Sequence, residues 1–127
     1  MMPYCLTYFL VEYDQTTFDM QDFCTQLSLD FATVQRFSAD GFTEIGRNEN
    51  FHQDINVMIR QTLKDLLGKE EILLALKDKY ALSFTLERVP LLQTDESAPY
   101  QKLSLDEDVI RFMYLCKVKD DLDYHII

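Results

Sequence analysis

A chain of 127 residues with 47% hydrophobic and 13% aromatic side chains predicts one globular domain over residues 1–127. Twelve basic and 22 acidic residues give a net charge of −10, which disfavours nucleic acid and anionic membranes because no basic stripe exists to neutralise phosphates. No apolar run approaches the roughly 20 residues of a membrane span.

Cysteine use and the start of the chain indicate the compartment. The three cysteines (Cys5, Cys24 and Cys116) are odd in number and widely separated, which is typical of reduced thiols rather than of a disulfide framework. The first residues lack the basic region and the small-residue cleavage site of a signal peptide. We therefore expect a cytoplasmic protein.

Residues 4–13 form the first predicted strand. Both of its faces are largely apolar, which indicates a central strand covered on both sides, or covered on one side by the fold and on the other by a partner. The alternating sets are Tyr4, Leu6, Tyr8 and Leu10 on one face and Cys5, Thr7, Phe9 and Val11 on the other.

A short helix is predicted next, from an N-cap at Asp19 to about Leu27. Asp22 lies in its first turn, near the positive end of the helix dipole. Phe18 just before the cap is placed to pack on Phe23 as a hydrophobic staple. These signals agree with one another, so the position of this helix is well specified.

Two strands are then expected at residues 31–37 and 42–45. The Asp-Gly pair at 40–41 lies between these aromatic-rich segments and favours a hairpin. The polar stretch 46–50 is interpreted as a loop that delivers the chain into a helix.

The longest helical pattern spans residues 51–80. Gly68 divides it, because a glycine suits the left-handed backbone that ends a helix. Glu70 and Glu71 then open a second helix at its positive end. The apolar face of the first helix consists of Ile55, Met58, Ile59, Thr62, Leu63, Leu66 and Leu67, at the spacing of a 3.6-residue period.

The last third of the chain holds one more strand, a loop, a helix and a final strand. Residues 81–89 alternate as a half-exposed strand, and 90–101 contain two prolines and read as a loop. Ser104 and Glu107 form a capping box that starts the last helix. Residues 121–126 alternate as a terminal strand.

This order of elements predicts an α+β fold. We expect a single antiparallel or mixed sheet with helices packed mainly on one face. The first six elements match a ferredoxin-like (split βαβ) core, to which a C-terminal helix and strand are added.

The sequence carries no motif of a known catalytic or nucleotide-binding site. It has no C-x-x-C, no H-E-x-x-H and no glycine-rich phosphate loop, and only three glycines in all. The cysteines fall on apolar faces, where buried inert thiols are the rule. We therefore predict no catalytic residue and no cofactor, and we favour a protein that is not an enzyme.

Two weaker patterns could hold an ion. Arg47 follows Gly46 just before the predicted long helix, where an anion could bind at the helix N-terminus. Asp121, Asp123 and His125 share one face of the terminal strand and could converge on a divalent metal. Charges on an edge strand that block edge-to-edge pairing produce the same pattern without an ion, and we favour that interpretation.

Several stretches together resemble a family of small bacterial proteins that contain domain of unknown function 4279. They are Ile45-Gly46, residues 66–80 (LLGKEEILLALKDKY), Leu103-Ser104-Leu105 and the ending Asp121-Leu122-Asp123-Tyr124. The family's small-Pro-Thr turn is replaced here by Asp30-Phe31-Ala32-Thr33. The resemblance implies a small α+β protein of the bacterial cytosol and transfers no catalytic residue.

The leading functional hypothesis is a protein-binding module for a basic partner, in the manner of an immunity-type inhibitor. The acidic excess lies toward the two ends of the chain, and complementary charge favours association with a basic surface. The alternatives are a small-ligand or metal-binding domain and a structural subunit of a homo-oligomer. The residues expected to meet the partner are Asp106, Glu107, Asp120, Asp121 and Asp123.

Overall fold

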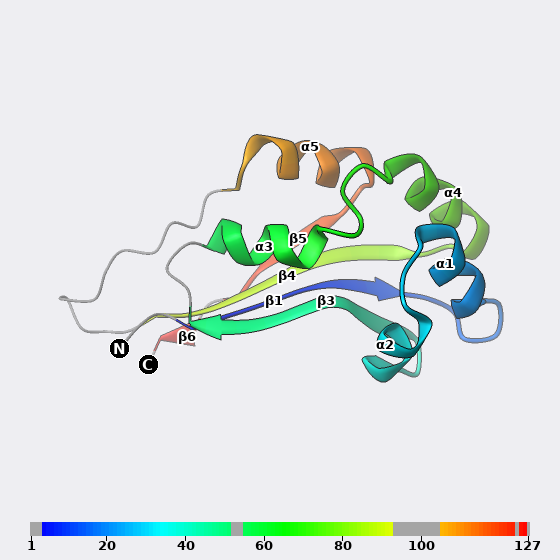
Figure 1. Cartoon of the computed structure of the whole chain (residues 1–127), viewed down its shortest axis with the longest axis horizontal. Coiled ribbons are helices and arrows are strands. Elements are labelled where there is room, and N and C mark those ends of the chain that lie inside the picture. The colour runs from blue at the N-terminus through cyan, green and yellow to red at the C-terminus, as the bar shows by residue number, and fades with distance from the viewer. Residues whose placement is uncertain (1–3, 52–54, 93–104, 124, 127) are drawn as a thin grey trace.

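The computed structural model describes residues 4–51, 55–92, 105–123 and 125–126, which form one sheet with helices layered on one face (Figure 1). The predicted α+β class is confirmed. The strands are β1 (Tyr4–Glu12), β2 (Ser38–Ala39), β3 (Phe42–Phe51), β4 (Ser83–Leu92), β5 (Lys119–Leu122) and β6 (His125–Ile126). The helices are α1 (Met20–Leu27), α2 (Phe31–Arg36), α3 (Ile55–Leu63), α4 (Glu70–Tyr80) and α5 (Glu107–Leu115).

The strand order is β2-β3-β1-β4-β5, and β6 also pairs with β4. β1 is antiparallel to both of its neighbours, β3 and β4. β3 fills the space between β1 and β2, and β1 fills the space between β3 and β4, so two β-α-β units interleave as in ferredoxin-like folds. After α5 the chain returns as β5, parallel to β4. The predicted split βαβ core with an added helix and strand is confirmed, and the sheet is mixed.

The core lies between the sheet and the helix layer. Cys5, Thr7, Phe9 and Val11 of β1 point toward the helices and are fully buried. The ring of Phe9 lies 5.2 Å from that of Phe84 in β4 and 6.3 Å from that of Phe112 in α5 (centroid distances), so aromatic contacts join the sheet to the last helix. Other large side chains buried in this core are Phe23, Leu27, Ile55, Ile59, Leu63, Leu66, Leu73 and Leu86.

Small residues let α3 approach the sheet closely. Gly46 in β3 has a left-handed backbone (φ +66°), and a Cβ there would overlap the backbone of Thr62 in α3. The hydroxyl of Thr62 lies 2.7 Å from that of Thr7 in β1, so the two buried side chains satisfy each other. The sequence needs a glycine at 46 for both reasons, conformation and space.

The helix predicted after the first strand is present with its cap. The side chain of Asp19 accepts a hydrogen bond from the Asp22 amide (3.1 Å), and the ring of Phe18 packs 5.6 Å from that of Phe23. The Tyr80 hydroxyl and the Lys79 ammonium both donate to Asp22, at 2.7 and 2.9 Å. These hydrogen bonds, that of Tyr80 first, hold the pKa of Asp22 at about 2 and join α1 to α4.

The strand predicted at 31–37 was wrong, because residues 31–36 form α2. Phe31 and Val34 are three residues apart and pack into the core from one side of a helix. The Ser38 hydroxyl donates to the carbonyl of Val34 (2.8 Å) at the helix end, and only Ser38 and Ala39 remain as strand β2. The segment 31–37 is too short for the spacing of its apolar residues to distinguish a helix from a strand.

The boundaries around the long helical region also differ from the prediction. Residues 46–51 continue β3 instead of forming a loop, so α3 begins at Ile55. The predicted inward face of Ile55, Met58, Ile59, Thr62 and Leu63 is confirmed. β3 extends to Phe51 because it pairs with the whole length of β1, and each residue added to the pairing satisfies backbone hydrogen bonds.

The last helix begins later than the capping box predicted. α5 starts at Glu107 with Asp106 as its N-cap, and Ser104 lies outside the described residues. The Asp106 amide donates to the side-chain carbonyl of Asn56 (3.0 Å), and this contact with α3 holds the chain extended through residue 106. The single terminal strand predicted at 121–126 is divided into β5 and β6.

Candidate functional site

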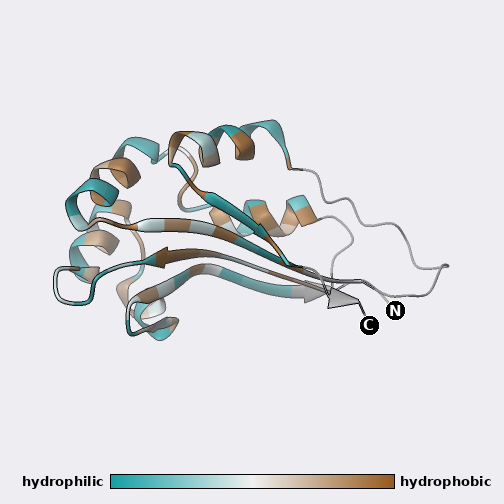
Figure 2. Cartoon of the chain, turned by 180° about the vertical axis from the view of Figure 1, so that it is seen from behind, coloured by the Kyte–Doolittle hydropathy of each residue, from teal (hydrophilic) through white to brown (hydrophobic). Residues whose placement is uncertain are grey.

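One face of the sheet has no helix over it in the described part of the chain. Seen from behind in Figure 2, no helix crosses in front of β1 and β4. We call this surface the open face. The register of the sheet defines it by the residues of β1, β3, β4 and β5 that point away from the helix layer.

The centre of the open face is apolar. Leu6, Tyr8 and Leu10 of β1 lie on it and are half-buried. Phe42 of β3 and Val89 of β4 flank them, also half-buried. This is the second apolar face that the sequence of β1 predicted, and no helix of the described residues covers it.

Acidic side chains surround this apolar centre. Glu87 pairs in register with Asp121, Leu10 with Glu44, and Leu6 with Glu49, so all four acids share the open face. The cations placed there by the described register are Arg47 and Lys119, the latter opposite Thr85. β5 is mostly hydrophilic in Figure 2. The acids that surround the centre are Glu12, Glu44, Glu49, Glu87 and Asp121.

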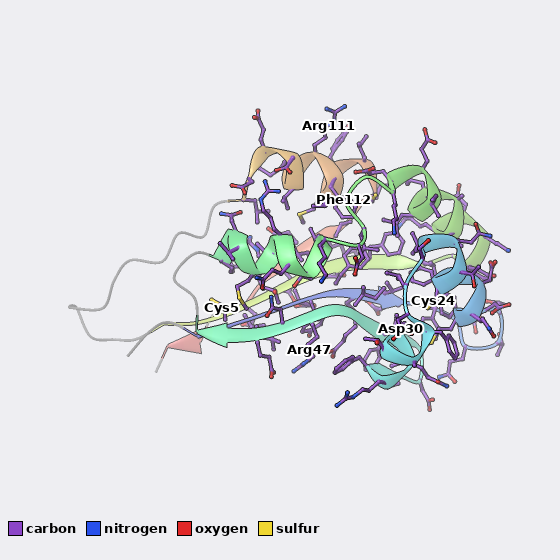
Figure 3. The ribbon with its side chains drawn as sticks, in the orientation of Figure 1. Cys5, Cys24, Asp30, Arg47, Arg111 and Phe112 are labelled. Atoms are coloured by element: carbon purple, nitrogen blue, oxygen red, sulfur yellow. The ribbon has the colours of Figure 1, made fainter. Side chains whose placement is uncertain are left out.

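Arg47 lies over the ring of Tyr8, on the side of the sheet away from the helices (Figure 3). Its guanidinium carbon is 5.6 Å from the ring centroid, and its nitrogens contact Glu44 (2.5 Å) and Glu49 (2.8 Å). A bulge at Gly46–Arg47 turns this side chain onto the open face. The predicted anion site depended on a helix N-terminus beside Arg47, and the structure places Arg47 within β3 instead.

Glu87 and Asp121 repel each other across neighbouring strands. The pKa of Glu87 is raised to about 7, chiefly by burial and then by a hydrogen bond with Asp121 and the charge of that residue. The charges of Asp123 and Glu12 act in the same direction. The pKa of Tyr8 is also raised, by burial and then by Glu87 and Glu44. A positive charge placed near Glu87 and Asp121 would relieve the repulsion between these two carboxylates.

The five acids predicted to meet a partner do not form one surface. Asp120 lies on the helix side of β5 and holds Arg88, which is only 4% exposed, through two contacts of 2.6 and 2.9 Å. Asp106 binds Arg60 (3.0 Å), which also pairs with Asp108. Glu107 is exposed at the start of α5. Of the five, Asp121 and Asp123 lie near Glu87 at the open face.

The described residues supply neither a metal cluster nor a reactive thiol. Among them, no three His, Cys, Asp or Glu side chains are placed to share one metal ion, and the side chain of His125 lies outside the described set. All three cysteines are buried. Burial raises the pKa of the Cys24 and Cys116 thiols to about 11, so both stay protonated near neutral pH.

An acidic surface for a basic partner was also expected around residues 12–22, which includes Glu12, but sequence reasoning missed three acids of the open face: Glu44, Glu49 and Glu87. Glu87 could have been found, because it is the polar member of the alternating strand 81–89. Glu44 and Glu49 could not, because they are five residues apart and only the bulge between them brings both side chains to one face.

A comparison with protein-family models finds no match, and comparisons with curated proteins and with solved structures find none either. Across the described residues, every helix is too short or too polar to cross a lipid bilayer.

Proposed function

We propose that this protein is a binding module for a basic protein and that it docks its partner on the open face. The observation that carries the proposal is a sheet with one face that no described helix covers, whose centre is apolar and whose border is acidic. Soluble proteins bury such apolar strips, either inside the fold or under a partner. An acidic border around the strip selects a partner of opposite charge and speeds its approach.

The arrangement around Arg47 supports this choice of partner. One arginine already lies on the ring of Tyr8 between two carboxylates on the β3 side of the open face. On the β5 side, Glu87 and Asp121 present two more carboxylates next to the same tyrosine, since both act on its pKa. Lysine and arginine side chains of a partner would find there the same combination of aromatic ring and acid.

An inhibitor of immunity type that occupies the basic surface of a toxin would use such a face, and the resemblance to the bacterial family with domain of unknown function 4279 is compatible with this role. No catalytic chemistry is required for it. The acidic net charge of −10 serves this function by steering a basic partner toward the protein over distances of about a Debye length.

Two charge-reversal variants with the same net charge test the proposal. Glu12→Lys with Asp121→Lys alters the open face, and Glu71→Lys with Asp78→Lys alters the exposed surface of α4. Each pair changes the net charge from −10 to −6, since two reversals add +4. Asp120 is left alone because it holds the buried Arg88.

We expect the wild type and the α4 variant to capture one basic protein from a lysate of the source cells in near-stoichiometric amount. The open-face variant should lose it, and the association rate for the purified pair should fall steeply with salt. Capture that survives the open-face reversal, or that depends equally on the α4 reversal, would contradict the proposed surface.

A further inference from the structure

We propose a second interaction surface, on the outer side of α5, and we infer that its occupant is a second copy of this chain. The surface is defined by four exposed residues of α5 and of the turn that follows it: Glu107, Ile110, Tyr114 and Lys117. It lies on the helix layer, on the opposite side of the sheet from the open face (Figure 1), and it stands independently of the proposed function.

Exposed apolar side chains are concentrated on this helix. Five large hydrophobic residues of the described chain are exposed, and three of them belong to α5: Ile110 (51%), Tyr114 (82%) and Leu115 (41%). Tyrosine at this exposure is a typical anchor of protein interfaces, because it buries a large rigid ring at little entropic cost. Val109, Phe112, Met113 and Cys116 occupy the buried side, so the core does not use the outer residues.

The outer stripe is complementary to itself. It runs in the order acid, aliphatic, aromatic, base: Glu107, Ile110 and Tyr114 on α5, and Lys117 in the left-handed turn (φ +55°) directly after the helix. When two copies of α5 pair antiparallel about a two-fold axis at position 112, Glu107 meets the partner's Lys117, and Ile110 meets the partner's Tyr114. Both pairs are centred on position 112, which is the midpoint of 107 and 117 and also of 110 and 114. A two-fold interface requires such self-complementarity.

The remaining charges of α5 lie beside this stripe. Arg111 points away from the sheet in Figure 3, whereas Phe112 points inward. Arg111 and Asp108 border a hollow between α5 and the α3–α4 connection, with Leu67 and Leu115 among its lining residues. Asp108 is held by Arg60 (2.6 Å). Asp108 therefore has its own cation, while Arg111 borders the same surface as Glu107, Ile110 and Tyr114.

The size of the contact sets the expected affinity. A nine-residue helix spans about 13 Å, and a pair of such helices buries less than the roughly 1,200 Å² of a standard interface. We therefore expect a reversible dimer with a dissociation constant on the order of tens to hundreds of micromolar. It leaves both open faces accessible, so a dimer would present two copies of the open face.

Sedimentation equilibrium of the purified protein from 5 to about 500 µM at physiological salt tests the surface. The wild type should shift from monomer to dimer over this range. Tyr114→Ala should raise the dissociation constant at least tenfold, whereas Phe37→Ala, which removes an exposed ring at the end of α2, should leave it unchanged. A wild type that stays monomeric at the highest concentration, or a dimer that tolerates Tyr114→Ala, overturns the proposal.

A charge swap tests the two-fold pairing itself. Glu107→Lys gives a net charge of −8 and Lys117→Glu gives −12, while the double variant returns to −10. Specific pairing predicts that each single reversal weakens the dimer several-fold and that the double variant restores it to within about twofold. If Glu107→Lys instead strengthens the dimer, the net charge governs association, and the pairing is wrong.

The open-face variant Glu12→Lys with Asp121→Lys separates this inference from the proposed function. It should dimerise as the wild type does, even when it has lost the basic partner. Loss of the dimer in that variant would show that two copies associate through the open face, and it would overturn the assignment to α5.

Discussion

The two faces of β1 carry apolar side chains in similar measure, but the helices of the described residues cover only one of them. On the helix side, Phe9 and Val11 are fully buried beneath the helix layer, and Phe9 contacts Phe112 of α5. On the open side, Tyr8 and Leu10 remain half-exposed among acids. The contrast teaches that alternation along a strand specifies which residues share a face, whereas the remaining chain specifies which face becomes core.

The largest difference between the faces should appear for two adjacent residues of β1. Phe9→Ala empties a fully buried aromatic site and should lower the free energy of unfolding by about 3–5 kcal/mol. Tyr8→Ala loses partial burial and the contact with Arg47 and should cost about 1 kcal/mol. Urea titrations of the two variants measure both values, and equal losses would contradict the assignment of the open face.

The close approach of α3 to the covered face can be tested at Gly46. Gly46→Ala adds a Cβ that overlaps the Thr62 backbone at a left-handed position, and we expect a loss of about 2–4 kcal/mol. Gly68 is the matched control, since it is also left-handed (φ +88°) but has open space around it. Gly68→Ala should cost only the backbone strain, about 1–2 kcal/mol. Thermal unfolding of both variants would show this order.

Asp120 and Asp121 are neighbours in β5 that serve opposite faces. Asp120→Asn removes the negative charge that pairs with the buried Arg88, and it should cost about 2 kcal/mol. Asp121→Asn removes a charge that repels Glu87, and at pH 8 it should stabilise the protein by about 0.5 kcal/mol. Urea titrations at pH 8 show whether the two substitutions change the free energy of unfolding in opposite directions. If both substitutions lower the free energy of unfolding, Asp121 stabilises the fold as Asp120 does, and the predicted gain from removing its repulsion of Glu87 is wrong.

The smallest effect is the pH dependence of the open face. The pKa of Glu87 is raised to about 7 in the folded state, above the ordinary value of 4.5. The folded state therefore holds the proton more tightly, and the stability that Glu87 contributes is complete below pH 4.5 and is lost as the pH rises through 7. Because Glu87 is partly exposed, we expect a loss of less than about 1 kcal/mol.

Glu87→Gln should remove this part of the pH profile, so that the variant gains stability over the wild type between pH 5 and 8. The groups facing Glu87 are Tyr8 and Glu12 on β1 and Asp121 and Asp123 at the β5 side. Glu71→Gln on the outer surface of α4 serves as the control and should follow the wild-type profile. Parallel profiles for all three proteins would contradict the raised pKa.

Much of the fold could be predicted because its signals are local. The cap at Asp19, the staple of Phe18 on Phe23 and the apolar stripe of α3 all depend on residues within a few positions of one another. The order of the elements then restricted the topology to a split βαβ core with an added helix and strand. The acidic net charge followed from composition, and the absence of known catalytic motifs followed from the spacing of residues in the sequence.

Tertiary structure decided the rest, for reasons of pairing and proximity. The bulge at Gly46 changed which residues of β3 share a face, and α3 packs closely against that glycine. The neighbours Asp120 and Asp121 received different roles only because Arg88 lies on one side of β5 and Glu87 on the other. The sequence of β1 determined that it has two apolar faces, and only the placement of the described helices determined which of them lies against the helix layer.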